Sequence, residues 1–226
     1  MRITEIESLT AKKAKVLFDE EPSLVLYKGE LKRLCWQENT EVSPEEYQRV
    51  LRDIVEKRAK LYAMRLLQDQ DRTEKEITDK IRRAGYDPAT AQAALDYVKG
   101  FDYVNDERYA SNYIDRYRGV KSQRQIRQDL TKRGITSETV SSMLEDQTVE
   151  SDEYAAIVTL LKKRHYTPVT EETDISGLSD EPGSEDRQEL YKQAQKERDR
   201  QLRYLASKGF SYSAVRFVFD HWDELA

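Results

Sequence analysis

At 226 residues, with 38% hydrophobic and 36% charged residues, the chain can bury only a modest core and must expose a highly charged surface. Its formal net charge of −5 argues against indiscriminate coating of nucleic acid, although an average can conceal local basic patches. The single cysteine excludes an internal disulfide and fits a reducing cytosol, while the missing signal-peptide pattern and the lack of long apolar runs predict no membrane partner.

Residues 1–42 differ from the rest of the chain and predict a small β segment. Two short apolar runs, Val16 to Phe18 and Leu24 to Tyr27, are separated by Pro22, and Lys28-Gly29 is typical of a tight turn. We therefore expect an antiparallel hairpin or a three-stranded sheet. The next stretch, LKRLCWQE, is compatible with an extension of the last strand or with a helix.

Residues 43–104 predict a first three-helix unit preceded by a leading helix. Ser43 and Pro44, followed by two glutamates, are typical of a helix start. Apolar residues then follow helical spacing to about Gln68, which predicts one long helix or two joined helices.

An internal repeat becomes visible when the chain is aligned on glycines. In each copy a helix ends at a glycine that can take the left-handed conformation, an apolar residue folds back, and a polar residue caps the next helix. The glycines are Gly85, Gly134 and Gly209. The caps are Asp87, Thr136 and Ser211. The third copy is the loosest of the three.

A helix also precedes each copy, so the repeating unit has three helices. We place the second unit at 105–149 and the third at 150–226, with an acidic insertion at 165–186. The insertion is expected to be disordered or weakly ordered, as a solvated linker or as a competitor of phosphates for a basic helix. The predicted fold is mainly α, with tandem three-helix repeats in an elongated curved array because each unit is too small to bury a core alone.

The segment from Asn112 to Gly134 concentrates cations, with seven lysines and arginines against two acids. In its predicted helix, Ile126 and Leu130 point inward and Arg124 lies on the opposite side. Two interpretations stay open: a solvated face with scattered ion pairs, or a surface for phosphates or an acidic protein. The candidate binding residues are Arg116, Lys121, Arg124, Arg127 and Lys132, with Lys80, Arg82 and Arg83 as the matching surface of the first unit.

Tyr109, Tyr113 and Tyr117 stand four residues apart and share one side of a predicted helix. Such a stripe is more typical of a surface that faces the core than of tyrosines that stack on bases. We interpret it as core-facing, with Ala110 and Ile114 adjoining it.

Signals of catalysis are poor. The sequence has no glycine-rich phosphate loop, no paired metal-ligand spacing and no nucleophile elbow. His165 and His221 are typical of structural or solvated histidines, and Cys35 beside Trp36 is typical of a buried thiol rather than a nucleophile. We expect no enzymatic activity, no cofactor and no small-molecule substrate.

Two motifs carry a resemblance to a known family. The segment YVNDERYASNYI (Tyr103 to Ile114) resembles a pattern of the RecX family of recombination regulators, and IRQDLTKRGI (Ile126 to Ile135) continues it. The resemblance extends from about Ala63 to Leu144 and, more loosely, into the third repeat. The chain departs from the family at Asn105, where Asp is commoner, and in its acidic insertion.

The resemblance implies three tandem three-helix units that lodge in the groove of the RecA filament on single-stranded DNA. It also implies restraint of ATP hydrolysis, strand exchange and co-protease activity by RecA, and some members bind DNA. We therefore predict a non-enzymatic, cytoplasmic modulator of RecA. The alternatives are a helical DNA-binding protein and a helical scaffold that acts independently of RecA.

Overall fold

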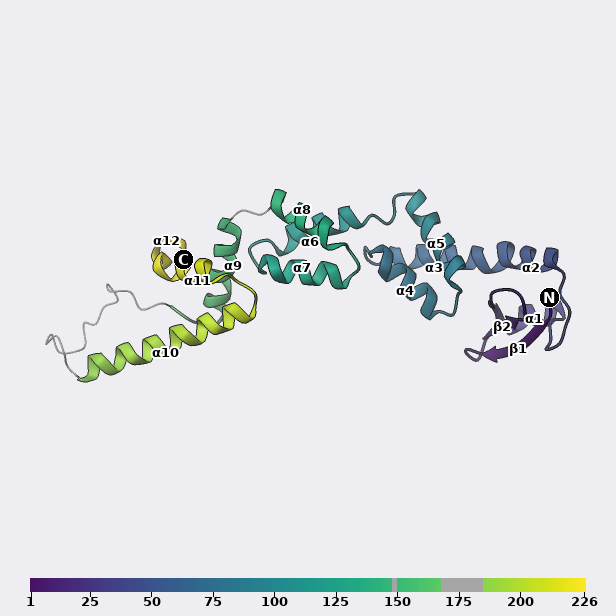
Figure 1. Cartoon of the computed structure of the whole chain (residues 1–226), viewed down its shortest axis with the longest axis horizontal. Helices are drawn as coiled ribbons and strands as arrows, with labels where there is room; N and C mark the ends of the chain where they lie inside the picture. The colour runs from purple at the N-terminus through teal and green to yellow at the C-terminus, as the bar shows by residue number, and fades with distance from the viewer. Residues whose placement is uncertain (148–149, 168–184) are drawn as a thin grey trace. The chain divides into compact units, whose positions relative to one another are not determined.

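The computed structural model describes residues 1–147, 150–167 and 185–226 (Figure 1). The chain folds as two compact units, Met1–Tyr109 and Ala110–Ala226. We call these two compact units the first unit and the second unit; they are larger than the three-helix units predicted from the sequence. The described residues are mainly helical, with one small sheet near the N-terminus. Most of the predicted acidic insertion, residues 168–184, lies outside the described residues.

The sheet of the first unit is antiparallel and has three strands in the order β1-β2-β3, which confirms the larger of the two predicted arrangements. The strands are β1 (Ile3–Ser8), β2 (Lys13–Phe18) and β3 (Leu24–Tyr27). Along β2, Ala14 and Val16 are buried and alternate with half-buried lysines, as the two-residue period of a strand requires. Val16 pairs with Ile6 on one side and with Leu24 on the other.

The end of this β segment differs from the prediction at two residues. Lys28-Gly29 is the start of helix α1 (Lys28–Leu34) and no tight turn, because the Glu30 carboxylate accepts a hydrogen bond from the Tyr27 backbone N–H at 2.8 Å and holds the first turn. The helix ends at Cys35, which has a φ of +57° and an exposed thiol. The predicted burial of Cys35 is therefore wrong, and Trp36 is the buried residue.

The predicted leading helix is continuous. It runs through α2 (Pro44–Val50), the π-helical segment η1 (Leu51–Glu56) and α3 (Lys57–Gln68). The Ser43 hydroxyl caps it by accepting a hydrogen bond from the Glu46 N–H at 3.1 Å. Helices α4 (Glu74–Arg83) and α5 (Pro88–Gly100) complete the first unit.

Arg58 joins the sheet to helix α3. Its guanidinium forms an ion pair with Glu30, donates a hydrogen bond to the Val25 carbonyl at 3.1 Å and lies over the Tyr27 ring. The sheet and the helices also share one hydrophobic core. The strands contribute Val16 and Leu24 to it, and the helices contribute buried residues of α2 to α5.

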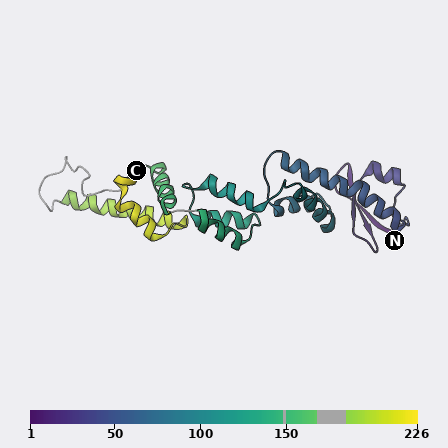
Figure 2. The same ribbon diagram turned by 90° about the horizontal axis from the view of Figure 1, so that it is seen from above.

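The second unit is helical throughout its described residues. Helix α6 (Asp106–Tyr117) leads into it and is followed by α7 (Gln123–Lys132) and α8 (Ser137–Gln147), which pack together (Figure 2). Helices α9 (Glu150–Lys163), α10 (Glu185–Ser207), α11 (Tyr212–Asp220) and α12 (Trp222–Leu225) follow. Ile157, Leu161 and Leu205 belong to the hydrophobic cluster of these last helices.

The three repeat glycines all have positive φ, +97° at Gly85, +101° at Gly134 and +87° at Gly209. This confirms the predicted left-handed ends of three helices. The predicted caps are also confirmed, because the side chains of Asp87, Thr136 and Ser211 each accept a backbone N–H of the following helix.

The described residues at the two ends of the predicted acidic insertion adjoin helices α9 and α10. Tyr166 is buried and meets Phe219 edge-on, with 5.7 Å between the ring centroids. Helix α10 already begins at Glu185. His165 ends the α9 turn with a φ of +53°.

Candidate functional site

Helix α7 presents cations on the side opposite its core. Ile126 and Leu130 are fully buried, whereas Arg124 and Arg127 are exposed. The first turn of α7 contains Arg124 and, like the first turns of α5 and α11, no acid, whereas helices α2, α4 and α6 carry acids at this position. A cation at the positive end of a helix is unfavourable by about 0.3–1 kcal/mol, so Arg124 is not there to stabilise α7.

Arg116, near the end of α6, is also exposed. Among the described residues, the structure shows no carboxylate partner for Arg116, Arg124 or Arg127. The neighbouring Arg118 differs, because it pairs with Asp115 at 3.5 Å and with Asp152 at 3.6 Å. We call Arg116, Arg124 and Arg127 the open basic surface.

Lys121 is held inside the second unit. Its ammonium donates to the Tyr113 hydroxyl and to the Asp129 carboxylate, both at 2.8 Å, and lies 3.9 Å from the centre of the Tyr117 ring. Burial disfavours the charged ammonium, but the hydrogen bonds to Asp129 and Tyr113 offset this and raise the pKa of Lys121. The Lys121 hydrogen bond in turn lowers the pKa of Asp129. The charge of Lys121 is thus already compensated.

The aliphatic stem of Arg124 makes a packing contact within the second unit. A Cβ atom at Gly209 would lie 2.9 Å from Arg124 Cδ, so the stem packs closely against the turn that follows α10. Beside it, the buried Ser122 hydroxyl donates to the Lys208 carbonyl at 2.7 Å and accepts the Gln125 N–H at 3.2 Å. This contact ties the start of α7 to the end of α10.

The remaining candidates occupy the last turns of helices. Lys132, at the end of α7, is exposed, and its charge helps to lower the pKa of Asp129. Arg82 and Arg83 are exposed and Lys80 is half-buried in the last turn of α4, where cations complement the helix dipole. These last three residues belong to the first compact unit, whereas the open basic surface belongs to the second.

The tyrosine stripe of α6 is half-buried, so the core-facing interpretation is only partly right. Ala110 and Ile114 are fully buried, whereas Tyr113 and Tyr117 are half-buried with their ring centroids 4.5 Å apart. Burial raises the pKa of the Tyr113 phenol, whose hydroxyl also donates to Asp129 at 2.9 Å. These tyrosines surround Lys121 rather than forming the core.

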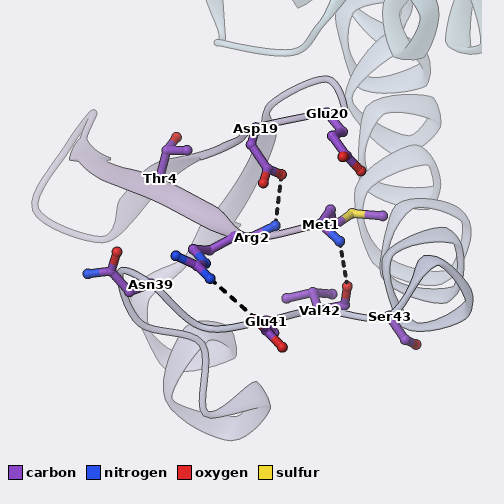
Figure 3. A pocket seen from close by; sticks show the side chains of 9 residues that line it. All are labelled: Met1, Arg2, Thr4, Asp19, Glu20, Asn39, Glu41, Val42 and Ser43. Carbon is purple, nitrogen blue, oxygen red and sulfur yellow. Dashed lines mark hydrogen bonds and ion pairs between the residues drawn. The ribbon is translucent and has the colours of Figure 1, made fainter.

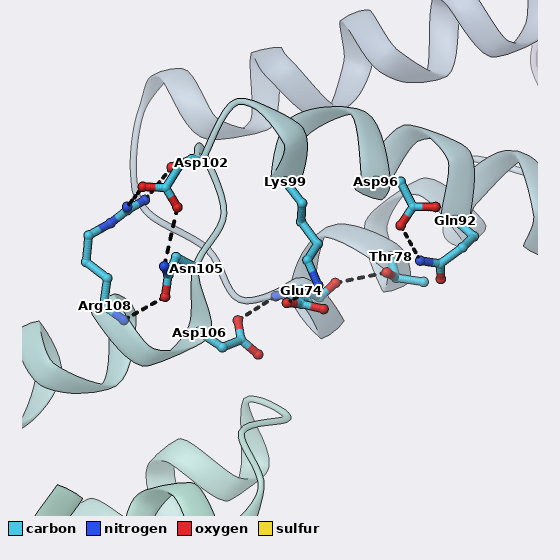
Figure 4. Close-up of polar contacts among 9 residues, drawn as sticks. All are labelled: Glu74, Thr78, Gln92, Asp96, Lys99, Asp102, Asn105, Asp106 and Arg108. Carbon is cyan, nitrogen blue, oxygen red and sulfur yellow. Dashed lines mark hydrogen bonds and ion pairs between the residues drawn. The ribbon is translucent and has the colours of Figure 1, made fainter.

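Asp106 is a structural residue that the sequence patterns did not reveal. Its carboxylate accepts a hydrogen bond from the Glu74 backbone N–H at 2.9 Å and so caps α4 from a helix 32 residues away (Figure 4). Burial raises the pKa of Asp106. The sequence signalled only that Asp106 is acidic. It could not indicate the cap, because the Asp106 carboxylate and the Glu74 N–H are brought together by the fold rather than by spacing along the chain.

A polar hollow of about 880 Å³ lies beside the N-terminus in the first unit (Figure 3). Within it, the Arg2 backbone N–H donates to Asp19 at 2.8 Å and the Arg2 guanidinium pairs with Glu41 at 3.4 Å. The Ser43 hydroxyl at its edge is the cap of α2. These polar groups satisfy one another, and the hollow therefore gives no reason to assign a ligand.

Other chemistry-bearing residues have structural contacts. His221 stacks on Phe217 with 4.2 Å between ring centroids, and its Nδ1 lies 3.0 Å from the Phe217 carbonyl. In the part of the chain that the structure describes, no group of three or more His, Cys, Asp or Glu residues could hold a metal ion. None of the described helices is long and apolar enough to cross a membrane.

Two family models match this chain: RecX, first three-helix domain, at residues 59–97, and RecX, second three-helix domain, at residues 105–144. A relative from Caldanaerobacter subterraneus subsp. tengcongensis, named Regulatory protein RecX, is 32% identical over 129 residues, which cover 57% of this chain and 66% of the relative. A Regulatory protein RecX from Streptococcus gordonii is 26% identical over 99% of this chain and 78% of its own length. The chain belongs to the RecX family.

Two solved RecX structures share its fold. A crystal structure of regulatory protein RecX aligns with a TM-score of 0.57 and 20% identity over 97% of this chain and 100% of that chain. RecX from Lactobacillus salivarius aligns with a TM-score of 0.55 and 22% identity over 74% of this chain and 96% of that chain. In RecX terms, the open basic surface lies in the second three-helix domain, and Lys80, Arg82 and Arg83 lie in the first.

Proposed function

We propose that this RecX protein binds the RecA recombinase assembled on single-stranded DNA and restrains its ATP hydrolysis and strand exchange. Two RecX three-helix domains and relatives named regulatory proteins support a regulatory, non-enzymatic role. RecA is the partner that the RecX resemblance implies. The contact is assigned here to the open basic surface of the second domain.

Among the described residues, no carboxylate pairs with Arg116, Arg124 or Arg127, and this observation carries the assignment. Other exposed cations among the described residues pair with nearby acids, as Lys57 does with Asp53 at 3.2 Å. Arg124 instead stands in an acid-free first turn, where the helix dipole opposes it. Three exposed guanidiniums of α6 and α7 that have no carboxylate partner in the described part of the chain are suited to an anionic partner.

Guanidinium groups bind carboxylates and phosphates with paired, charge-assisted hydrogen bonds. A filament of protein on single-stranded DNA offers both kinds of anion, and the proposal requires only that some of them face the groups of the open basic surface. Lys121 contributes to this surface indirectly, because its contacts with Tyr113 and Asp129 hold α6 against α7. We therefore treat Lys121 as a positioning residue.

Strand exchange by the cognate RecA, measured with and without the purified protein, tests the proposed function. We expect slower exchange as the protein is added, and binding of the protein to RecA-coated single strands in co-sedimentation. A protein that leaves exchange unchanged and does not co-sediment would favour the helical scaffold. Tight binding to duplex DNA with a sequence preference would favour the DNA-binding alternative.

A further inference from the structure

Three aromatic side chains at the end of helix α5 are exposed together. Tyr97, Phe101 and Tyr103 are 37%, 56% and 51% exposed, and we call them the aromatic patch. The ring centroids of Tyr97 and Phe101 are 5.0 Å apart, and those of Phe101 and Tyr103 are 5.7 Å apart in a stacked arrangement. Contiguous apolar groups on a surface commonly mark a binding site.

A rigid turn presents these rings. Asp102 has a φ of +54°, its N–H donates to the Lys99 carbonyl at 2.8 Å, and the Tyr103 N–H donates to the Val98 carbonyl at 3.0 Å. This is the turn that ends other helices of the chain, where the following apolar residue is buried against its own helix. Those buried residues are Tyr86, Ile135 and Phe210. Tyr103 takes the same position and is instead half exposed.

The charges around the aromatic patch are unsuited to nucleic acid. Lys60 lies 5.6 Å from the centre of the Tyr97 ring, but it pairs with Glu56 at 3.6 Å. Two further cations near the aromatic patch, Lys99 and Arg108, are also paired with carboxylates (Figure 4). Lys99 pairs with Glu74, and Arg108 pairs with Asp102. Asp96, beside Tyr97, is exposed and bonds only the neutral Gln92 amide among the described residues.

We infer that the aromatic patch docks onto a protein surface that has an apolar pocket with a basic rim. Aromatic residues supply some of the largest contributions to such contacts, and the exposed Asp96 carboxylate, which has no cationic partner among the described residues, suits a lysine or arginine on the partner. Stacking on single-stranded DNA would instead need free cations to follow the phosphates. The inference rests on the proposed function in one respect: RecA is the partner on which it is tested.

The test compares binding of variants to RecA filaments formed on single-stranded DNA. The double variant Phe101→Ala/Tyr103→Ala should bind about tenfold more weakly or worse, a loss of about 1.4 kcal/mol or more for the pair, because aromatic anchors are enriched among the residues that dominate such contacts. Both side chains are at least half exposed, so unchanged circular dichroism and melting temperature are expected. The matched control is Tyr212→Ala, which removes an aromatic side chain that is 63% exposed on α11, and it should bind like the wild type.

A charge reversal separates the possible occupants. Asp96→Lys should weaken filament binding if the partner has a basic rim, whereas it should tighten binding to naked single-stranded DNA if the aromatic patch stacks on bases. Wild-type affinity of the double variant, or tighter DNA binding by Asp96→Lys, would overturn the inference. A wild-type dimer that the double variant dissociates would also overturn it, in favour of self-association. If the wild type itself ignores RecA, the proposed function and this inference both fail.

Discussion

Two features of the structure favour glycine at position 85: a positive backbone φ and close packing around the Cα. Its φ is +97°, and a Cβ atom there would lie 2.8 Å from Leu9 Cδ1 and 3.1 Å from Val25 Cγ2. Gly85→Ala should therefore lower the free energy of unfolding by about 1–2 kcal/mol or more. Gly100→Ala is the matched control, because no atom lies within 4 Å of its added Cβ, and it should raise stability by about 0.5 kcal/mol.

Urea unfolding followed by circular dichroism measures both glycine variants. Equal effects of the two substitutions would contradict the constraint at Gly85, since both remove a glycine from the unfolded chain in the same way.

Asp129 makes stability depend on pH. Its folded pKa is below the ordinary value of 3.8 because Lys121 donates a hydrogen bond to its carboxylate. A carboxyl group with a lowered folded pKa stabilises the fold above its unfolded pKa and loses that contribution as the pH falls through the folded value. Asp129→Asn should therefore be less stable than the wild type at pH 6, and the difference should shrink below about pH 4. A difference that stays constant from pH 6 to pH 3 would contradict this account.

At the scale of helices, the Ser122 hydroxyl both caps its own helix and bonds the end of a second helix, whereas the Ser211 hydroxyl caps only its own helix. Both hydroxyls cap a helix, but the Ser122 hydroxyl is buried and also bonds the Lys208 carbonyl at the end of α10. Ser122→Ala should cost about 2–3 kcal/mol, because it removes a cap and leaves a carbonyl without its donor. Ser211→Ala should cost about 1 kcal/mol. Equal losses in urea unfolding would mean that the bond to Lys208 contributes nothing.

The sequence predicted helix ends and caps correctly where residues adjacent in the chain determine the local structure. The glycine ends and caps, such as Gly85 and Asp87, depend on a few adjacent residues and were predictable. The start of α1 was not predictable, because Lys28-Gly29 is equally compatible with a tight turn. The hydrogen bond from the Tyr27 N–H to the Glu30 carboxylate favours the helix. The exposure of Cys35 was not predictable either, because the spacing of its segment is compatible with both a strand and a helix.

The basic surface was predictable in outline and not in detail. Helical spacing separated Arg124 and Arg127 from the buried Ile126 and Leu130. It could not show that Lys121 is neutralised, because its partners Tyr113 and Asp129 stand on two helices whose packing no spacing encodes. Nor could it show that the stem of Arg124 packs against Gly209.

At the scale of the whole molecule, we propose that an acidic chain regulates RecA through a small open basic surface. The variant Arg116→Ala/Arg127→Ala tests this without disturbing the fold, since it spares Arg124 and Lys121, which have packing roles. Its matched control is Lys192→Ala/Lys196→Ala, which removes two exposed cations from α10 with the same change in net charge. Binding of the double surface variant should also respond less to salt than binding of the wild type.

The most direct measurement is ATP hydrolysis by RecA on single-stranded DNA, titrated with the wild type and both variants. We predict that the concentration for half-inhibition rises about thirtyfold for Arg116→Ala/Arg127→Ala, because each of the two lost contacts to an anion costs about 1 kcal/mol. The Lys192→Ala/Lys196→Ala control should inhibit like the wild type. Inhibition by the surface variant at wild-type concentrations would contradict the central claim.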